Sequence, residues 1–236
     1  MKNLLLISNS TNVGESYLEY PKYEMQKFLK SFNVKKALFI PYAGVTITFD
    51  EYTEKVKNRF KEIGINIESI HDKTNPVDAA KNAEAIIVGG GNTFNLLKLI
   101  QENGLIEVIR EKVVNGTPYI GWSAGSNLAC PTIRTTNDMP IVQPQSFNAF
   151  NIIPFQINPH YLDANPDGHA GETREMRIEE FIKANQNIFV AGLREGCIIK
   201  IINDTEISLI GNKTLRIFKY GKAPEEIKDN LKHLLC

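Results

Sequence analysis

A serine stands between small residues in the segment Gly121–Gly125, which reads Gly-Trp-Ser-Ala-Gly. The segment directly follows the short apolar run Pro118–Ile120, which predicts a buried strand. Gly-x-Ser-x-Gly at a strand-to-helix turn is a nucleophile elbow, in which small neighbours let the backbone turn sharply and lift the serine hydroxyl out. An ordinary tight glycine turn is the alternative, but the position after a strand favours Ser123 as a nucleophile.

Three consecutive glycines, Gly89–Gly91, follow another apolar run, Ala85–Val88. Without side chains, the backbone there can point its N–H groups at a bound phosphate or at an oxyanion. Neither of the glycine-rich phosphate-binding patterns occurs at this point, so an oxyanion hole is the better interpretation beside a serine elbow. Its predicted donors are the N–H groups of Gly90, Gly91 and Ala124, with a simple glycine turn as the alternative.

A serine nucleophile needs a base, which is usually histidine, and the chain has four histidines. His71 follows a predicted strand and His233 lies near the C-terminus, and neither has a motif around it. His160 follows an extended segment at the turn made by Pro159, whereas His169 lies in a loop rich in glycine and aspartate. Both of these stay candidates, and we favour His160.

Arg174 has an unusual place in the helix that is predicted over Thr173–Ala184. At about 100° per residue it shares the apolar stripe of Ile178 and Ile182. It also lies in the first turn of the helix, where the helix dipole disfavours a cation. An inward guanidinium at this point either pairs with a carboxylate such as Glu172 or binds an acidic ligand, and both interpretations stay open.

The elements that must position these residues alternate, in the first half of the chain, between apolar runs and amphipathic segments. This alternation predicts a doubly wound α/β fold with a mostly parallel sheet flanked by helices. Helix signals include a cap at Asp50 with a stop at Gly64, the pair Asn75-Pro76, and a stretch over Asn95–Val114 that breaks near Gly104. The predicted strands are Leu4–Ile7, Ala37–Ile40, Ile65–Ile70, Ala85–Val88 and Pro118–Ile120.

The carboxyl ends of parallel strands lie at one edge of the sheet, and ligands of such folds bind there. The segments predicted at this edge are Ser8–Ser10, Pro41–Ala43, Gly89–Asn92 and Ser123.

The second half of the chain is richer in strand signals. We expect Phe147–Ile157 to be extended and Ile188–Tyr220 to form an antiparallel meander or hairpin at one sheet edge. Its turns are predicted at Asn203-Asp204 and Gly211-Asn212. Because no linker interrupts the chain, residues 1–236 are predicted to form a single domain.

Composition excludes several classes of function. The chain has 27 Lys+Arg and 27 Asp+Glu, and this balance argues against a nucleic-acid partner. The basic run Lys55–Lys61 is predicted to be a solvated helix face. Apolar runs are too short for a signal peptide or a membrane span, and the three widely spaced cysteines argue against disulfides and a metal site. We expect a soluble, cytoplasmic protein without a cofactor, a metal or a membrane partner.

Five segments together resemble the peptidase E family, the aspartyl dipeptidases, which are serine peptidases related to the cyanophycinases. The resemblance extends roughly from Leu4 to Phe218. In chain order the five segments are Gly89–Phe94, Gly121–Ser126, Thr135–Pro140, Asn158–His160 and Gly171–Ile178.

The resemblance implies a class I glutamine-amidotransferase-like α/β fold, with a serine where those relatives carry cysteine. It also implies a cytoplasmic, metal-independent hydrolase of dipeptides that begin with aspartate. By position, Ser123 resembles the family's nucleophile and His160 its base, while Asp138 and Glu195 each match one assignment of the third triad member. The sequence departs from the family pattern at Arg194, where the family carries proline.

An acidic substrate favours the interpretation that Arg174 binds the aspartate side chain. Two alternatives stay open, namely a cyanophycinase-like hydrolase of β-aspartyl peptides and a catalytically silent small-molecule-binding protein of the same fold. The expected partner is a small Asp-X dipeptide, and the sequence leaves a homodimer open.

Overall fold

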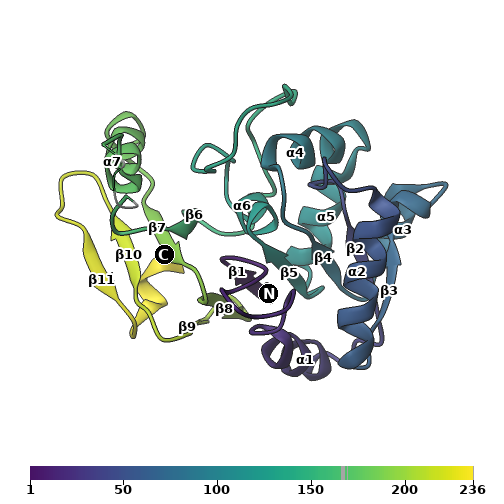
Figure 1. The fold of residues 1–236 in the computed structure, drawn as a ribbon. Coiled ribbons are helices and arrows are strands. Elements are labelled where there is room, and N and C mark those ends of the chain that lie inside the picture. The colour runs from purple at the N-terminus through teal and green to yellow at the C-terminus, as the bar shows by residue number, and fades with distance from the viewer. Residues whose placement is uncertain (166–167, 169, 236) are drawn as a thin grey trace.

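A seven-stranded sheet forms the centre of the computed structural model, which describes residues 1–165, 168 and 170–235. Its strand order is β3-β2-β4-β5-β1-β8-β9, in which the first five strands are parallel and the last two antiparallel (Figure 1). This arrangement confirms the predicted doubly wound, mostly parallel fold. The strands are β1 (Leu4–Ile7), β2 (Lys36–Ile40), β3 (Asn66–Ser69), β4 (Ile86–Val88), β5 (Tyr119–Trp122), β8 (Ile198–Ile202) and β9 (Glu206–Ile210).

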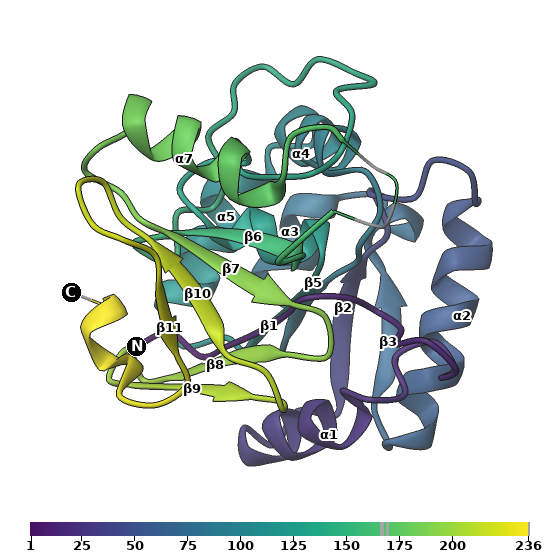
Figure 2. The same cartoon turned by 60° about the vertical axis from the view of Figure 1, so that its left-hand side comes forward.

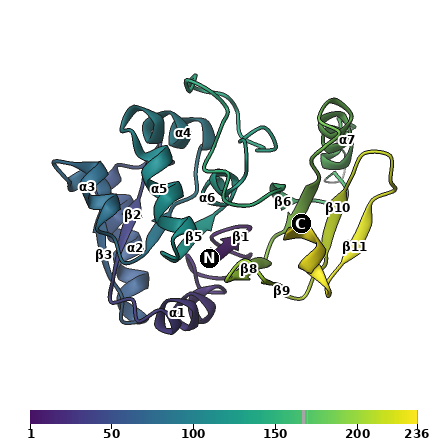
Figure 3. The same ribbon diagram turned by 180° about the vertical axis from the view of Figure 1, so that it is seen from behind.

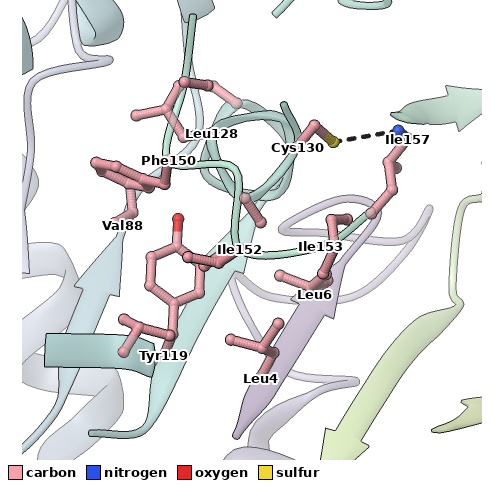
Figure 4. Packing of buried hydrophobic residues seen from close by; sticks show 14 of the residues in the cluster. Leu4, Leu6, Val88, Tyr119, Leu128, Cys130, Phe150, Ile152, Ile153 and Ile157 are labelled. Carbon is pink, nitrogen blue, oxygen red and sulfur yellow. Dashed lines mark hydrogen bonds between the residues drawn. The ribbon is translucent and has the colours of Figure 1, made fainter. Parts of the chain in front are cut away.

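Helices cover both faces of this main sheet because successive strand residues point to opposite sides. Leu5 of β1 packs in the core that α1 and α2 cover, whereas Leu4 and Leu6 pack under α3 to α6. Figure 4 shows the second of these cores, where Leu6 of β1 lies beside Ile153 and the segment with Phe150 and Ile152 lies between Leu128 of α6 and Tyr119 of β5. The helices are α1 (Lys22–Ser31), α2 (Phe49–Glu62), α3 (Pro76–Lys81), α4 (Thr93–Glu102), α5 (Leu105–Val114) and α6 (Ala124–Ala129).

Local signals set the helix boundaries, with one correction to the sequence prediction. The N-cap of α2 is Thr48 and not Asp50, because the Thr48 hydroxyl accepts a bond from the Glu51 N–H while the Glu51 carboxylate accepts one from the Thr48 N–H. Asp50 lies inside the first turn, where its charge suits the helix dipole. The expected break near Gly104 is confirmed, since this residue has a φ of 66° and separates α4 from α5.

A second, four-stranded sheet lies beside the main one, with the strand order β11-β10-β7-β6 (Figures 1 and 3). Helix α7 (Arg174–Ala184) lies against this sheet, as Figure 2 shows, and buries Ile178 and Ile182 there. Among the described residues, no helix of either part is both long and apolar enough to cross a membrane. The strands are β6 (Gln156–Tyr161), β7 (Val190–Arg194), β10 (Leu215–Phe218) and β11 (Glu225–Ile227), and two 3₁₀ turns, η1 (Ile70–Asp72) and η2 (Leu231–Leu235), complete the elements.

One expectation for the second half is wrong, and another is confirmed only in part. Most of Phe147–Ile157 forms no strand and only its last two residues belong to β6. The segment is apolar because its side chains, such as Phe150 and Ile152, pack into the main core (Figure 4). Its backbone is held to α6 instead of a strand, since the N–H groups of Phe150 and Ile152 donate to the carbonyls of Leu128 and Ala129.

The strands expected over Ile188–Tyr220 exist, but they do not form one meander. A hairpin turning at Asn203-Asp204 joins β8 to β9 at the edge of the main sheet, as predicted. Beyond Gly211, however, the chain returns to the second sheet as β10, which pairs with β7. Turn residues indicate where a strand ends, but which sheet the next strand joins depends on long-range packing.

Candidate active site

The Gly121–Gly125 segment forms the sharp turn between β5 and α6. Ser123 has the unusual backbone angles φ 51° and ψ −110°. A Cβ on Gly121 would lie 2.5 Å from the Gly125 carbonyl, and one on Gly125 would lie 2.2 Å from the Val88 carbonyl oxygen. Glycine is therefore required at both positions, and the turn holds the Ser123 hydroxyl at the carboxyl edge of the main sheet.

His160 lies beside this hydroxyl. Its Nε2 is 2.9 Å from Ser123 Oγ, and its Nδ1 is 2.7 Å from Glu195 Oε1. The pairing of β6 with β7 is irregular between Pro159 and Tyr161, and His160 has a φ of 54° at this bulge. A bulge re-aims a side chain out of the regular strand pattern, so this one accounts for the direction of the imidazole.

Two side chains of the segment after β1 hold this arrangement. Ser8, at the end of β1, accepts a bond from the His160 N–H at 2.9 Å and donates to the Leu193 carbonyl at 2.8 Å. Asn9 accepts a bond from the Gly196 N–H at 2.9 Å, next to Glu195. The Ser8–Ser10 segment, which the sequence predicted at the carboxyl edge of the sheet, thus holds the backbone of His160 and the backbone next to Glu195 through hydrogen bonds.

Asp138, the other candidate carboxylate, has different partners. Its Oδ2 accepts bonds from the Thr93 N–H at 2.7 Å and the Thr93 hydroxyl at 2.5 Å, at the first turn of α4. A carboxylate at a helix N-terminus is stabilised by the free N–H groups and the dipole there. Of the two carboxylates left open by the sequence, the structure therefore brings Glu195 to His160 and Asp138 to Thr93.

The glycine segment after β4 lies against the elbow. A Cβ on Gly90 would be 3.1 Å from Ser123 Cβ, and one on Gly91 would be 2.2 Å from the Ala43 carbonyl oxygen. Within the described chain, no hydrogen-bond acceptor contacts the N–H of Gly90, Gly91 or Ala124. The three predicted oxyanion donors are thus free N–H groups on the two segments nearest Ser123.

Arg174 lies in the first turn of α7 and is half-buried. Glu172, its expected structural partner, instead contacts Arg177 at 3.4 Å, and Arg174 forms no ion pair with any residue that the structure describes. Burial lowers the pKa of Arg174 and the Arg177 charge lowers it further, whereas the nearby Asp138 carboxylate raises it. A guanidinium keeps its charge at neutral pH all the same, so this cation is available to an anion.

The remaining histidines lie elsewhere. His71 Nε2 is 3.0 Å from an Asp50 oxygen and 3.1 Å from an Asp72 oxygen. His233 contacts the Asn230 carbonyl. His169 lies outside the described residues.

A cavity of about 700 Å³ opens beside the Ser123 hydroxyl. One wall of the cavity comes from α2 and the segment after β2. On this wall the Lys55 ammonium lies 4.1 Å from the centre of the Tyr17 ring. Residues lining the cavity include Ser10, Tyr17, Gly44, Ile47, Tyr52, Lys55, Gly90, Gly91, Trp122, Ser123 and His160.

Sequence reasoning missed two features of α2. Arg59 is only 8% exposed and donates to the Tyr17 carbonyl and the Ser16 hydroxyl, so the expected solvated face over Lys55–Lys61 is wrong at this residue. Helical periodicity could have shown this, since Arg59 lies seven residues after Tyr52 on the apolar stripe. The polar role of the Tyr52 phenol has no signal in the sequence, because its ring fits the stripe as well as any apolar side chain.

Comparison with known proteins assigns the family. The model of peptidase family S51 matches residues 4–209. The chain belongs to this family. It is 54% identical over 236 residues to a protein named Peptidase E from Nostoc sp. strain PCC 7120, covering 99% of this chain and 97% of that protein. It is 49% identical over 219 residues to Peptidase E from Shigella flexneri, covering 93% and 94%.

Solved structures share the fold of this S51 peptidase. The crystal structure of a peptidase from an acI-B1 Actinobacterium has a TM-score of 0.70 at 17% identity and covers 97% of this chain and 95% of its own. A 1.5 Å crystal structure from Listeria monocytogenes EGD-e has a TM-score of 0.66 at 23% identity and covers 90% and 100%. The family assignment confirms the prediction of a peptidase, and these structures confirm the fold.

Proposed function

We propose that this protein is a cytoplasmic serine dipeptidase that hydrolyses Asp-X dipeptides through an acyl-enzyme on Ser123. The observation that carries the proposal is the hydrogen-bonded line from Glu195 through His160 to Ser123 beside a cavity, in a chain of a peptidase family. A carboxylate that bonds a histidine, which in turn bonds a serine hydroxyl, is the spatial arrangement of a catalytic triad, and it does not depend on the order of the three residues along the chain.

Acylation begins when Ser123 Oγ forms a bond to the carbonyl carbon of the substrate and its proton passes to His160 Nε2. The Glu195 carboxylate accepts the His160 Nδ1–H, so it selects the tautomer that leaves Nε2 free and stabilises the imidazolium that forms. The N–H groups of Gly90, Gly91 and Ala124 can donate to the oxyanion, each contributing about 3 kcal/mol. The C–N bond then breaks as His160 returns the proton to the leaving amine.

Deacylation repeats these steps with water. A water molecule attacks the acyl carbon while His160 Nε2 accepts its proton, and the proton passes to Ser123 Oγ as the ester bond breaks. The products are aspartate and the amino acid X, and the enzyme returns to its starting state.

Arg174 supports the choice of an N-terminal aspartate. Its half-buried guanidinium has no ion-pair partner among the described residues, and it can bind a carboxylate through two parallel hydrogen bonds. A site built around this charge rejects an uncharged analogue, because the charge is then left without a partner. We therefore propose that Asn-X is refused despite its similar shape and that Glu-X is refused for its length.

A substrate panel tests the proposal. The purified protein is incubated with Asp-Leu, Asn-Leu, Glu-Leu and β-aspartyl-Leu, and the released amino acids are quantified by chromatography. We expect Asp-Leu to be hydrolysed roughly 100-fold or more faster than Asn-Leu. A preference for β-aspartyl-Leu would favour the cyanophycinase-like alternative. No hydrolysis together with no labelling of Ser123 by a serine-directed phosphonate would favour a silent binding protein. Cell fractionation tests the cytoplasmic location.

A further inference from the structure

The phenol of Tyr52 joins helix α2 to both segments that surround Ser123. Its hydroxyl donates to the Gly90 carbonyl at 2.9 Å. It accepts a bond from the Trp122 indole N–H at 3.2 Å and another from the Tyr17 hydroxyl at 3.3 Å. A phenol has one proton to donate and two lone pairs, so all of its hydrogen-bonding capacity is used. An indole N–H only donates and a carbonyl oxygen only accepts, so the proton of the Tyr52 hydroxyl is donated to the Gly90 carbonyl.

The surroundings of Tyr52 leave its ring little freedom. Tyr52 is 6% exposed, and the centre of its ring lies 5.2 Å from the centre of the Phe39 ring in an edge-to-face contact. A Cβ on Gly89 would be 2.5 Å from the Tyr52 oxygen, so the glycine segment packs directly on the phenol. Burial raises the pKa of Tyr52 to about 12, and the hydroxyl therefore keeps its proton throughout the neutral range.

The bond to Gly90 determines the direction of the next N–H group. The chain contains no cis peptide bond among its described residues, so the Gly90 carbonyl and the Gly91 N–H point in opposite directions from one peptide plane. The following peptide unit is held separately, since the Asn92 N–H donates to the Ala43 carbonyl, and the chain before the glycines is held where the Gly89 N–H donates to the Ile40 carbonyl. The peptide between Gly90 and Gly91 is flanked by two flexible residues, and Tyr52 is the side chain that bonds its carbonyl.

We infer that Tyr52 is a positioning residue for the oxyanion hole: by holding the Gly90 carbonyl, it keeps the Gly91 N–H turned away from α2 and available to the oxyanion formed at Ser123. This inference rests on the acyl transfer proposed above. It assigns α2 a role in the chemistry, although no residue of that helix reacts. Preorganised donors lower the barrier because they need no reorientation as the charge develops.

Tyr52→Phe tests this inference. The variant keeps the ring and loses only the hydroxyl, so the Gly90–Gly91 peptide can rotate. We expect kcat for Asp-Leu to fall about 10- to 100-fold with KM changed less than about threefold, since Ala124 still donates and ground-state binding is untouched. Loss of an interaction that forms only in the transition state lowers kcat and kcat/KM together.

Val56→Ala is the matched control, because Val56 is fully buried one turn further along α2 and makes no bond to the site. It should lower the melting temperature through lost packing and leave kcat near the wild-type value. Tyr52→Phe also leaves the Trp122 indole N–H without its partner, so its melting temperature should fall as well, and comparison of the two variants separates stability from positioning.

A second measurement does not depend on the substrate. A neutral fluorophosphonate reacts when Ser123 Oγ displaces fluoride at phosphorus while His160 accepts the proton, and its P–O oxygen needs the same donors. The inactivation rate should fall in Tyr52→Phe and not in Val56→Ala. If the wild type reacts with the phosphonate but hydrolyses no Asp-X dipeptide, the proposed substrate is wrong. The inactivation rates of the two variants still test the role of Tyr52 in that case. Wild-type kcat and inactivation rates in Tyr52→Phe, or equal losses in both variants, would overturn the inference.

Discussion

Replacing Glu195 by glutamine probes the contact that distinguishes the two candidate carboxylates. The glutamine amide has nearly the same shape, but its NH₂ group can donate to His160 Nδ1 and so favour the tautomer that protonates Nε2. That tautomer cannot accept the Ser123 proton. The substitution therefore changes the proton balance of the site while leaving the backbone of the Glu195-Gly196 turn in place.

The expected loss can be worked from the exposure of the pair. An amide in place of a buried triad carboxylate lowers turnover about 10⁴-fold in a serine peptidase. Here the side chains of His160 and Glu195 are 37% and 42% exposed, so water can replace part of the interaction. We expect kcat for Asp-Leu to fall about 10²- to 10³-fold, which corresponds to about 2.7–4.1 kcal/mol of activation free energy.

Asp138→Asn is the comparison variant. The Asp138 carboxylate accepts two bonds from Thr93 at the start of α4, so its loss should cost about 1 kcal/mol of folding stability, as for a helix cap. Its kcat should fall by less than about tenfold, because no bond joins Asp138 to His160 among the described residues. Steady-state kinetics on Asp-Leu and thermal melts of both variants provide the measurement. A larger loss of kcat in Asp138→Asn than in Glu195→Gln would refute this assignment.

Three further predictions concern the nucleophile, the substrate-binding arginine and an ion pair of the second sheet. Ser123→Ala should abolish Asp-Leu hydrolysis and leave the melting temperature within a few degrees of wild type. If this variant hydrolysed Asp-Leu at the wild-type rate, that result would contradict an acyl-enzyme on Ser123. Arg174→Met should lower the ratio of kcat/KM for Asp-Leu over Asn-Leu by at least about tenfold; an unchanged ratio with a lower melting temperature would make Arg174 a structural residue. Hydrogen bonding to Arg194 lowers the pKa of the Glu226 carboxyl to about 2 from its ordinary 4.5, so its contribution to stability is complete above pH 4.5 and is lost as the pH falls toward 2. Thermal melts of Glu226→Gln should accordingly differ from wild type at pH 7 and converge with it at pH 2, and a constant difference would contradict this linkage.

The sequence by itself determined the features that depend on near neighbours in the chain. Gly121 marks the nucleophile elbow because a Cβ there would collide with the Gly125 carbonyl four residues further along the chain. Gly104 ends a helix through its positive φ, and the apolar runs predict buried parallel strands with their carboxyl ends at one edge. These signals depend on residues close together in the chain. The main sheet, the role of Ser123 as nucleophile and the glycine N–H groups beside it could therefore be predicted from the sequence alone.

Only the tertiary structure decided contacts between groups far apart in the chain. Glu195 reaches His160 because β6 and β7 pair across an irregular register, and Asp138 reaches Thr93 because its segment crosses the start of α4. Each carboxylate matches one assignment in sequence, where no local pattern says which strand lies next to which. Tyr52 is the clearest case. Its ring follows the apolar period of α2, but the destination of its single proton depends on two glycine segments that only folding brings to it.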